Sequence, residues 1–306
     1  MEAARRKLTG ERNVLHLGDK AFPEALCNIP KPPKQLFIVG SVDALSEGLA
    51  IVGARKATPY GKTCATRFAK LASERGISII SGGARGCDTF SHEAALQCGG
   101  KTVVFLGGGC DCVYPPENFD LFQRVVDGGG AVVSEQDWTF IPQPWTFRER
   151  NRLIAGLAKA TLIVEAGLPS GTFSTADEAL AANREVLVVP GSITSRQSLG
   201  ANRLIYQGAT PIVDDDTFYD QLFTIFGCLK QDEVDVSKDS ESQGSLKYLL
   251  DSVQSKAMSL DEMIQVAREA GDNISMPELM LWLTECSRNG LIAQYFDGRY
   301  GPATSC

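Results

Sequence analysis

The pattern that most restricts the fold of this chain is a repeated alternation of short apolar runs with longer amphipathic stretches. Seven runs rich in branched apolar residues are predicted to be buried strands, at residues 36–39, 50–52, 77–80, 103–106, 131–133, 162–164 and 186–189. Helical periodicity occupies stretches between them, as in residues 62–75, 89–98 and 172–183. Nearly continuous apolar strands that alternate with helices are typical of a parallel sheet covered on both faces. Because crossover connections are right-handed, we predict a doubly wound, mostly parallel α/β sheet.

This alternation occupies only part of the chain, so four segments are predicted. Residues 1–33 are too short and too mixed for a domain and are expected to be an arm packed on the start of the sheet. Residues 34–228 would form the Rossmann-like domain, and the polar, charged segment 229–245 is predicted to be a linker. In residues 246–306, three helical stretches precede two short runs joined by Asp297-Gly298, which is a hairpin signal. We expect a small winged-helix domain there.

Charge and composition restrict the class of partner and the compartment. The formal net charge is −7, of which residues 230–245 and 246–306 contribute −3 each, leaving −1 for the rest. A nearly neutral domain can still hold a cationic cleft, because a cleft concentrates the local field. No apolar run approaches the roughly 20 residues that span a bilayer, and no signal peptide is recognisable, so a cytoplasmic protein without a membrane partner is expected. The nine scattered cysteines lack metal-ligand spacing and are expected to be reduced thiols.

Four glycine-rich segments each follow a predicted strand. They are Gly53-Ala54-Arg55, Gly82-Gly83-Ala84-Arg85-Gly86, Gly107-Gly108-Gly109 and Ser170-Gly171-Thr172. Loops at the carboxyl ends of parallel strands gather along one edge of the sheet, where glycine lets backbone amides and helix N-termini approach an anion. With arginine in two loops, the pattern favours a phosphate-containing ligand. No segment matches the dinucleotide fingerprint or the Walker loop, so neither cofactor class is predicted.

A second basic cluster contains Arg148, Arg150 and Arg152 and is preceded by three aromatic residues, Trp138, Phe140 and Trp145. Arginines beside aromatic rings can track a sugar-phosphate backbone while bases stack. The alternative is the solvated start of a helix above buried aromatics, and the cluster alone does not decide between them.

Six blocks are similar, in order and spacing, to the signature of the DNA-processing protein A (DprA/Smf) family. They read IVGARKATPYG, SGGARGCDTFSHEAAL, LGGGCDCVYPPEN, FRERNRLIAGLA, IVEAGLPSGTFSTADEA and VVPGS. The resemblance covers about residues 21–215, and the tail resembles the family's winged-helix module more weakly. It implies a protein that binds single-stranded DNA without sequence preference, forms a homodimer, and hands the strand to a RecA-type recombinase during DNA uptake in natural transformation.

When the family's motifs are matched to this sequence, the resemblance implies a DNA- and phosphate-binding site without metal or cofactor. Its members are Gly53, Arg55, Lys56, Gly82, Gly83, Arg85, Gly86, Arg148, Arg150, Asn151, Arg152, Ser170, Gly171 and Thr172. Three positions depart from the family pattern. Ala54 replaces a serine, Arg148 replaces a proline, and Pro144 stands where a basic residue is common. The dimer face is not identified by the pattern, although apolar Leu204, Ile205 and Ile212 are candidates.

Catalysis is not expected, because the chain has two histidines, His16 and His92, no GxSxG elbow, and no carboxylate pair beside the glycine loops. One alternative is kept: a nucleotide-binding protein, or a phosphoribohydrolase resembling the LOG enzymes, whose GGxGTxxE helix start is approached by the segment before Asp177 and Glu178. Both carboxylates lie beyond the required spacing and would face another direction on the helix.

Overall fold

The computed structural model describes residues 6–168, 170–227, 246–272, 274–288, 291–295 and 298–302. The chain divides into two compact units, Met1–Gln231 and Asp232–Cys306. The predicted linker at 229–245 lies outside the described residues. No helix in the described part of the chain is long and apolar enough to cross a membrane.

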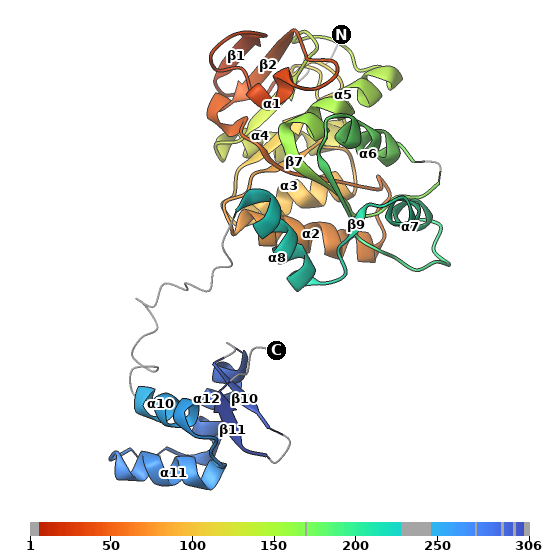
Figure 1. The fold of residues 1–306 in the computed structure, drawn as a ribbon. Helices are drawn as coiled ribbons and strands as arrows, with labels where there is room; N and C mark the ends of the chain where they lie inside the picture. Colours follow the sequence, from red (N-terminus) through yellow and green to blue (C-terminus); the bar gives the residue numbers. More distant parts are fainter. Residues whose placement is uncertain are drawn as a thin grey trace. The chain divides into compact units, whose positions relative to one another are not determined.

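The described residues of the larger unit form a nine-stranded sheet in the order β1-β2-β6-β5-β4-β3-β7-β8-β9 (Figure 1). The strands are β1 (Arg12–His16), β2 (Gln35–Gly40), β3 (Gly48–Val52), β4 (Ile79–Ser81), β5 (Thr102–Phe105), β6 (Ala131–Ser134), β7 (Ala158–Ile163), β8 (Glu185–Val188) and β9 (Thr210–Pro211). Every neighbouring pair from β6 to β9 is parallel, whereas β2 is antiparallel to both β6 and β1. The predicted doubly wound, mostly parallel sheet is confirmed, and each of the seven predicted runs overlaps a strand.

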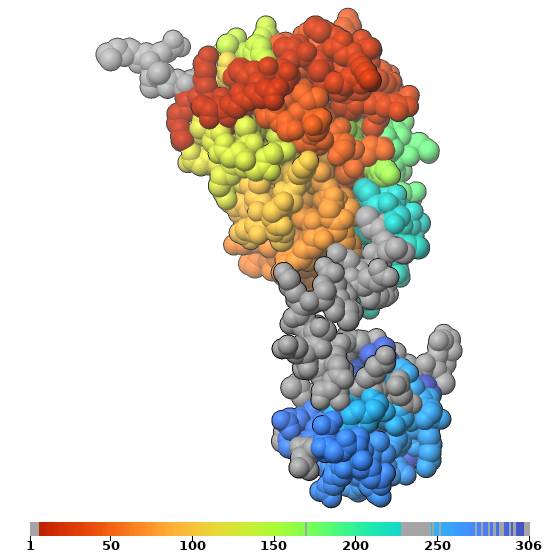
Figure 2. Space-filling view, turned by 90° about the vertical axis from the view of Figure 1, so that its left-hand side faces the viewer, coloured from red at the N-terminus to blue at the C-terminus, as the bar shows by residue number. Residues whose placement is uncertain are grey.

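Two edge strands were not indicated by the apolar runs. Strand β1 alternates exposed and half-buried residues, so it lacks the continuous apolar run of a central strand. It pairs with β2, and β2 pairs with β6, which places the beginning of the chain beside residues far along it. Figure 2 shows the red N-terminal residues side by side with the yellow-green ones. Strand β9 has only two residues, too few for a periodic pattern.

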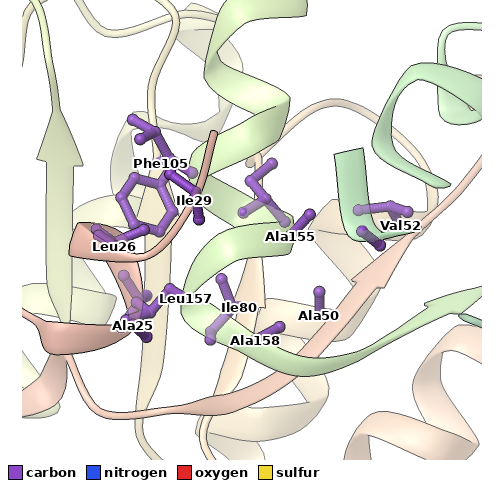
Figure 3. Close-up of a cluster of buried hydrophobic side chains, with 14 of the residues drawn as sticks. Ala25, Leu26, Ile29, Ala50, Val52, Ile80, Phe105, Ala155, Leu157 and Ala158 are labelled. Carbon is purple, nitrogen blue, oxygen red and sulfur yellow. The ribbon is translucent and has the colours of Figure 1, made fainter. Parts of the chain in front are cut away.

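Helices cover both faces of the sheet. They are α1 (Glu24–Cys27), α2 (Pro59–Ser73), α3 (Cys87–Gln97), α4 (Phe119–Asp127), α5 (Pro144–Leu157), α6 (Thr172–Ala181), α7 (Leu199–Tyr206) and α8 (Asp215–Phe226). On one face, Phe68 of α2 and Phe218 of α8 pack in a cluster with Ile79 of β4. On the other face, Leu26 of α1 joins a cluster that includes Phe105 and residues of α5 such as Ala155 (Figure 3).

The strand order reverses at β3, and this reversal positions the site. From β3 the chain adds β4, β5 and β6 on one side, and α5 then leads to β7 on the other side of β3. Loops that leave β3 and β7 therefore turn toward opposite faces, which opens a crevice at the carboxyl ends of these strands. In open α/β sheets such a topological switch point is where ligands bind.

The smaller unit has three helices and a pair of strands among its described residues. These are α10 (Lys247–Ser255), α11 (Leu260–Glu269), α12 (Met276–Arg288), β10 (Ile292–Gln294) and β11 (Tyr300–Pro302). The strands pair antiparallel, as predicted, although Asp297 of the predicted turn lies outside the described residues. Leu249, Met263, Leu283 and Ile292 are buried together and form the core. Ser259 and Glu262 cap α11 reciprocally, a signature that the sequence carries directly.

Candidate nucleic-acid interface

A pocket of about 680 Å³ lies at the switch point, and we call it the switch-point pocket. Three segments bring sequence-predicted residues to it: the loop after β3, the first half of α5, and the start of α6. These residues are Gly53, Arg55, Arg148, Arg150, Asn151, Ser170, Gly171 and Thr172. The structure thus brings together in space most of a set that spans more than a hundred positions of the sequence.

A smaller hollow of about 180 Å³ adjoins the switch-point pocket, and we call it the loop pocket. The two pockets share Arg55, Tyr114, Phe147 and Arg150 in their walls. The loop pocket adds three further predicted residues, Lys56, Gly82 and Arg85. The pockets therefore form one connected site that follows the carboxyl ends of β7, β3, β4 and β5.

Three basic side chains of this site carry charge that no described protein group neutralises. Arg55, Lys56 and Arg148 are exposed, and no hydrogen bond or ion pair to them is found among the described residues. The Arg55 guanidinium lies 5.7 Å from the centroid of the Phe147 ring, a cation–π contact that orients it without cancelling its charge. Arg85 differs, because its Nε donates to a carboxylate oxygen of Glu117 and the pair is exposed.

Arg150 has a different environment from its neighbours in the sequence. Its side chain is buried, and its Nη1 donates to the carbonyl oxygen of Gly82 at 2.7 Å and also to that of Phe105. Burial lowers the pKa of Arg150 to about 10, while the nearby carboxylate of Asp88 opposes the shift. Arg150 lines both pockets, but its guanidinium is held by the ends of β4 and β5. Arg150 thus lies in the groove, as predicted, and also positions the two loops, while its contact with phosphate stays a prediction.

Arg152 does not line either pocket. Its Nε donates to the carbonyl oxygen of Lys31 at 2.9 Å, and its Nη2 lies 2.6 Å from a carboxylate oxygen of Glu135. The side chain is only 11% exposed, so these contacts occupy it. The sequence pattern grouped Arg152 with the site because it stands close to Arg148 in the chain, and the structure corrects this assignment.

Gly83 and Gly86 shape the second glycine loop without lining a pocket. Gly86 has a φ of +79°, and a Cβ added there would lie 2.2 Å from the carbonyl oxygen of Ala54. A Cβ on Gly83, where φ is +64°, would lie 2.4 Å from the ring of Phe122. Gly86 therefore lets the loop after β4 approach the loop after β3, and Gly83 lets it pack against α4. Arg55 and Arg85 of these two loops both line the loop pocket.

Asp88 fixes the same loop from inside the molecule. Its carboxylate accepts hydrogen bonds from the backbone amides of Gly82 at 3.2 Å and Ala84 at 3.3 Å. Burial raises the pKa of Asp88, whereas the positive charge of Arg150 and these amide donors lower it. Asp88 lines the switch-point pocket, although its place within the second signature block did not by itself mark it as a site residue.

The helix N-termini at this edge differ in the protein groups that already bind their first amides. At the start of α2, the amide and hydroxyl of Thr58 donate to the buried carboxylate of Glu165 at 2.9 and 2.7 Å. A protein group therefore already occupies that N-terminus. At the start of α6, Gly171 and Thr172 line the pocket, and a Cβ added to Gly171 would meet no neighbouring atom within 4 Å. The amide of Thr172 already donates to the Ser170 hydroxyl at 3.2 Å. In the sequence, Glu165 is recognisable only as an acidic residue that directly follows an apolar strand, and this does not reveal its contact with Thr58.

The groups required for hydrolysis are not gathered among the described residues of this site. Asp177 lines a separate pocket with Arg184 and Gln207, and Glu178 does not line the switch-point pocket. Among the described residues of that pocket the carboxylate is Asp88, which is engaged by amides. His92 is fully buried, its Nδ1 lies 2.7 Å from the Thr102 hydroxyl, and burial lowers its pKa to about 3. The described residues also contain no cluster of metal-ligand type.

The fold and the pockets together define a Rossmann-like α/β protein with a cationic crevice at its topological switch point. Within that class, the chain belongs to the DNA recombination-mediator protein A family, whose model matches residues 13–223. Relatives include DNA processing protein DprA from Bacillus subtilis, 35% identical over 69% of this chain and 71% of its own length. Protein Smf from Escherichia coli is 38% identical over 66% of this chain, which spans about half (54%) of that relative's length.

Two solved structures have the same fold as this chain. The X-ray structure of DNA processing protein A from Streptococcus pneumoniae has a TM-score of 0.64 and 32% identity, covering 69% of this chain and 74% of that one. DNA processing protein A from Helicobacter pylori, whose structure describes a single-stranded DNA binding mode, also has a TM-score of 0.64, with 29% identity over 72% of this chain and 99% of that one.

Proposed function

We propose that this chain binds single-stranded DNA along the joined switch-point and loop pockets, without cutting it. The observation that carries the proposal is the set of three cations, Arg55, Lys56 and Arg148, that no described residue pairs on one edge of the sheet. Gly171 and Thr172 at the start of α6 line the same pocket, where the positive end of the helix dipole favours an anion. The single-stranded DNA binding mode described for the Helicobacter pylori relative supports the same ligand.

Binding of this kind has little sequence preference, because cations and helix N-termini contact phosphates and not base edges. The rings of Tyr114 and Phe147, whose centroids are 5.5 Å apart, stand in the wall and offer faces on which any base can stack. A paired duplex would hide its bases from these rings. We therefore expect single strands to bind more tightly than duplex.

We further propose that the protein acts as a homodimer that passes the strand to a RecA-type recombinase during DNA uptake, in the cytoplasm. Membership of the recombination-mediator family supports this role. Two of the residues considered for the dimer face, Leu204 and Ile212, are buried in the core of the larger unit and are unsuited to it. Tyr206 and Val213 are 82% and 62% exposed, so the surface around α7 and β9 is the better candidate.

A direct test is a fluorescence anisotropy titration of the full chain with a labelled single strand, a duplex of the same sequence, and nucleoside monophosphates. We expect the single strand to bind most tightly and to be recovered intact. Tight binding of a mononucleotide with release of free base would instead support the phosphoribohydrolase alternative. Equal affinity for single strand and duplex would contradict the proposed mode.

A further inference from the structure

A third pocket of about 650 Å³, which we call the apolar pocket, lies next to the site. It shares Tyr114, Pro144 and Phe147 with the switch-point pocket, so the two meet along this wall. Its other walls come mainly from the loops after β5 and β6, with residues Cys112, Val113, Pro116, Phe119, Ile141 and Pro142. In sheet order, the switch-point, loop and apolar pockets follow the strand ends from β7 to β6.

The charged groups of the apolar pocket are paired within the protein. Arg6 lies 2.5 Å from a carboxylate oxygen of Asp120. The buried carboxylate of Asp111 lies 3.3 Å from Lys7 Nζ and 2.8 Å from an Arg12 guanidinium nitrogen. Among the described residues, each cation at the apolar pocket is paired with a carboxylate, so this pocket offers no free positive charge to a phosphate. The switch-point pocket does offer such charges. The apolar pocket suits an uncharged, largely apolar group.

A nucleic acid strand has two chemically different sides, and the two kinds of pocket match them. Its phosphates are anionic, whereas its bases are flat, uncharged and partly apolar. The Tyr114 and Phe147 rings stand between a cationic pocket and an apolar one. A strand held by its phosphates on the cationic side can therefore turn its bases past these rings into the apolar pocket.

We infer that the apolar pocket holds nucleobases of the strand whose backbone lies in the switch-point pocket, with Val113 and Ile141 as base contacts. This inference rests on the proposed function, because it assumes that a single strand is the ligand. It assigns the loops after β5 and β6 to the binding surface, beyond the phosphate contacts at β3, β4 and β7.

The test compares an oligothymidylate with an abasic oligonucleotide of the same length, which keeps the phosphates and lacks the bases. Ile141 is 56% exposed, so Ile141→Ser removes an apolar wall without opening the core. Ile193→Ser is the matched control, because Ile193 is 83% exposed and lines none of the three pockets. We expect Ile141→Ser to weaken oligothymidylate binding at least about threefold. Abasic binding should not change, and the control should match wild type for both ligands.

Other outcomes distinguish a failure of this inference from a failure of the proposed function. If wild type prefers oligothymidylate and Ile141→Ser keeps that preference, the bases bind elsewhere and the inference is overturned. If Ile141→Ser weakens both ligands equally, the pocket does not act on bases, which also overturns it. If Ile141→Ser leaves both affinities intact but changes self-association in sedimentation velocity, the pocket serves a second copy of the chain, and the inference is again overturned. If neither ligand binds wild type, the proposed function itself fails.

Discussion

The guanidinium of Arg150 donates from Nη1 to the carbonyl oxygen of Gly82 at 2.7 Å, which ties α5 to the glycine loop after β4. A Cβ on Gly82 would lie 2.5 Å from the same nitrogen, so the loop approaches the guanidinium as closely as glycine allows. Asp88 holds the other side of that loop through the amides of Gly82 and Ala84. Two buried residues, Arg150 and Asp88, therefore hold the glycine loop from two sides.

The first prediction concerns this pair. Arg150→Met should lower the free energy of unfolding by about 2–4 kcal/mol, because it leaves the buried carbonyl oxygens of Gly82 and Phe105 without their charged donor. Arg148→Met, on the exposed side of the same helix, should change it by less than about 0.5 kcal/mol. Urea denaturation followed by circular dichroism measures both variants. Equal stability of the two would contradict the positioning role.

A second prediction compares a glycine at the contact between two loops with a glycine in open space. Gly86 and Gly99 have similar φ values of +79° and +68°, but a Cβ meets the Ala54 carbonyl at 2.2 Å only at Gly86. Gly99→Ala should cost about 1 kcal/mol, from the left-handed conformation alone. Gly86→Ala should cost at least about 2 kcal/mol more, because the two loops must separate and because the φ of +79° and ψ of −128° at Gly86 are open essentially to glycine alone. Thermal or urea unfolding of the two variants gives the comparison, and similar losses would show that loop contact is unimportant.

A third prediction addresses the phosphate contacts. Arg55→Ala and Arg148→Ala should each weaken single-strand binding and reduce the slope of log affinity against log salt concentration by about 0.7, as expected for one lost contact to a single strand. Arg124→Ala is the control, since Arg124 is also exposed but pairs with Glu93 and lines neither pocket of the site. Anisotropy titrations at several salt concentrations measure the slopes. An unchanged slope in both variants would place the strand elsewhere.

The fourth prediction is a pH dependence of stability from His92. Burial lowers its pKa to about 3, whereas in the unfolded chain a histidine titrates near 6.5. Below about pH 6.5 the unfolded chain therefore takes up a proton that the folded chain does not, so the free energy of unfolding decreases as the pH falls toward 3. The slope approaches about 1.4 kcal/mol per pH unit. His92→Gln should remove this component between about pH 6.5 and 5, which chemical denaturation at several pH values can show.

The fifth prediction concerns the smaller unit. Residues 246–306 carry a net charge of −3, which disfavours direct contact with DNA phosphates. We propose that this segment, expected to be a winged-helix module, contacts protein or modulates the dimer. Its deletion should leave single-strand affinity nearly unchanged in anisotropy titrations. A large loss of affinity would assign it to DNA binding.

The three arginines of α5 show where prediction from sequence stops. Arg148, Arg150 and Arg152 are two residues apart, so successive ones point about 200° away from each other on a helix. They consequently reach three environments: the open pocket, the loop carbonyls and Glu135. Sequence proximity suggested a single cluster, and nothing in the local pattern indicated that Glu135 or the Lys31 carbonyl would be within reach.

The sequence by itself determined the parallel sheet, the positions of its central strands and the glycine loops at their carboxyl ends. Strand burial and tight turns are local requirements, so they are visible in the periodicity of apolar residues and in the positions of glycine. Only the tertiary structure decided which cations remain free, that Glu165 fills the N-terminus of α2, and that an apolar pocket adjoins the cationic one. Those features depend on side chains far apart in the chain competing for the same donors and acceptors. That competition is settled only when the strands are assembled in their final order.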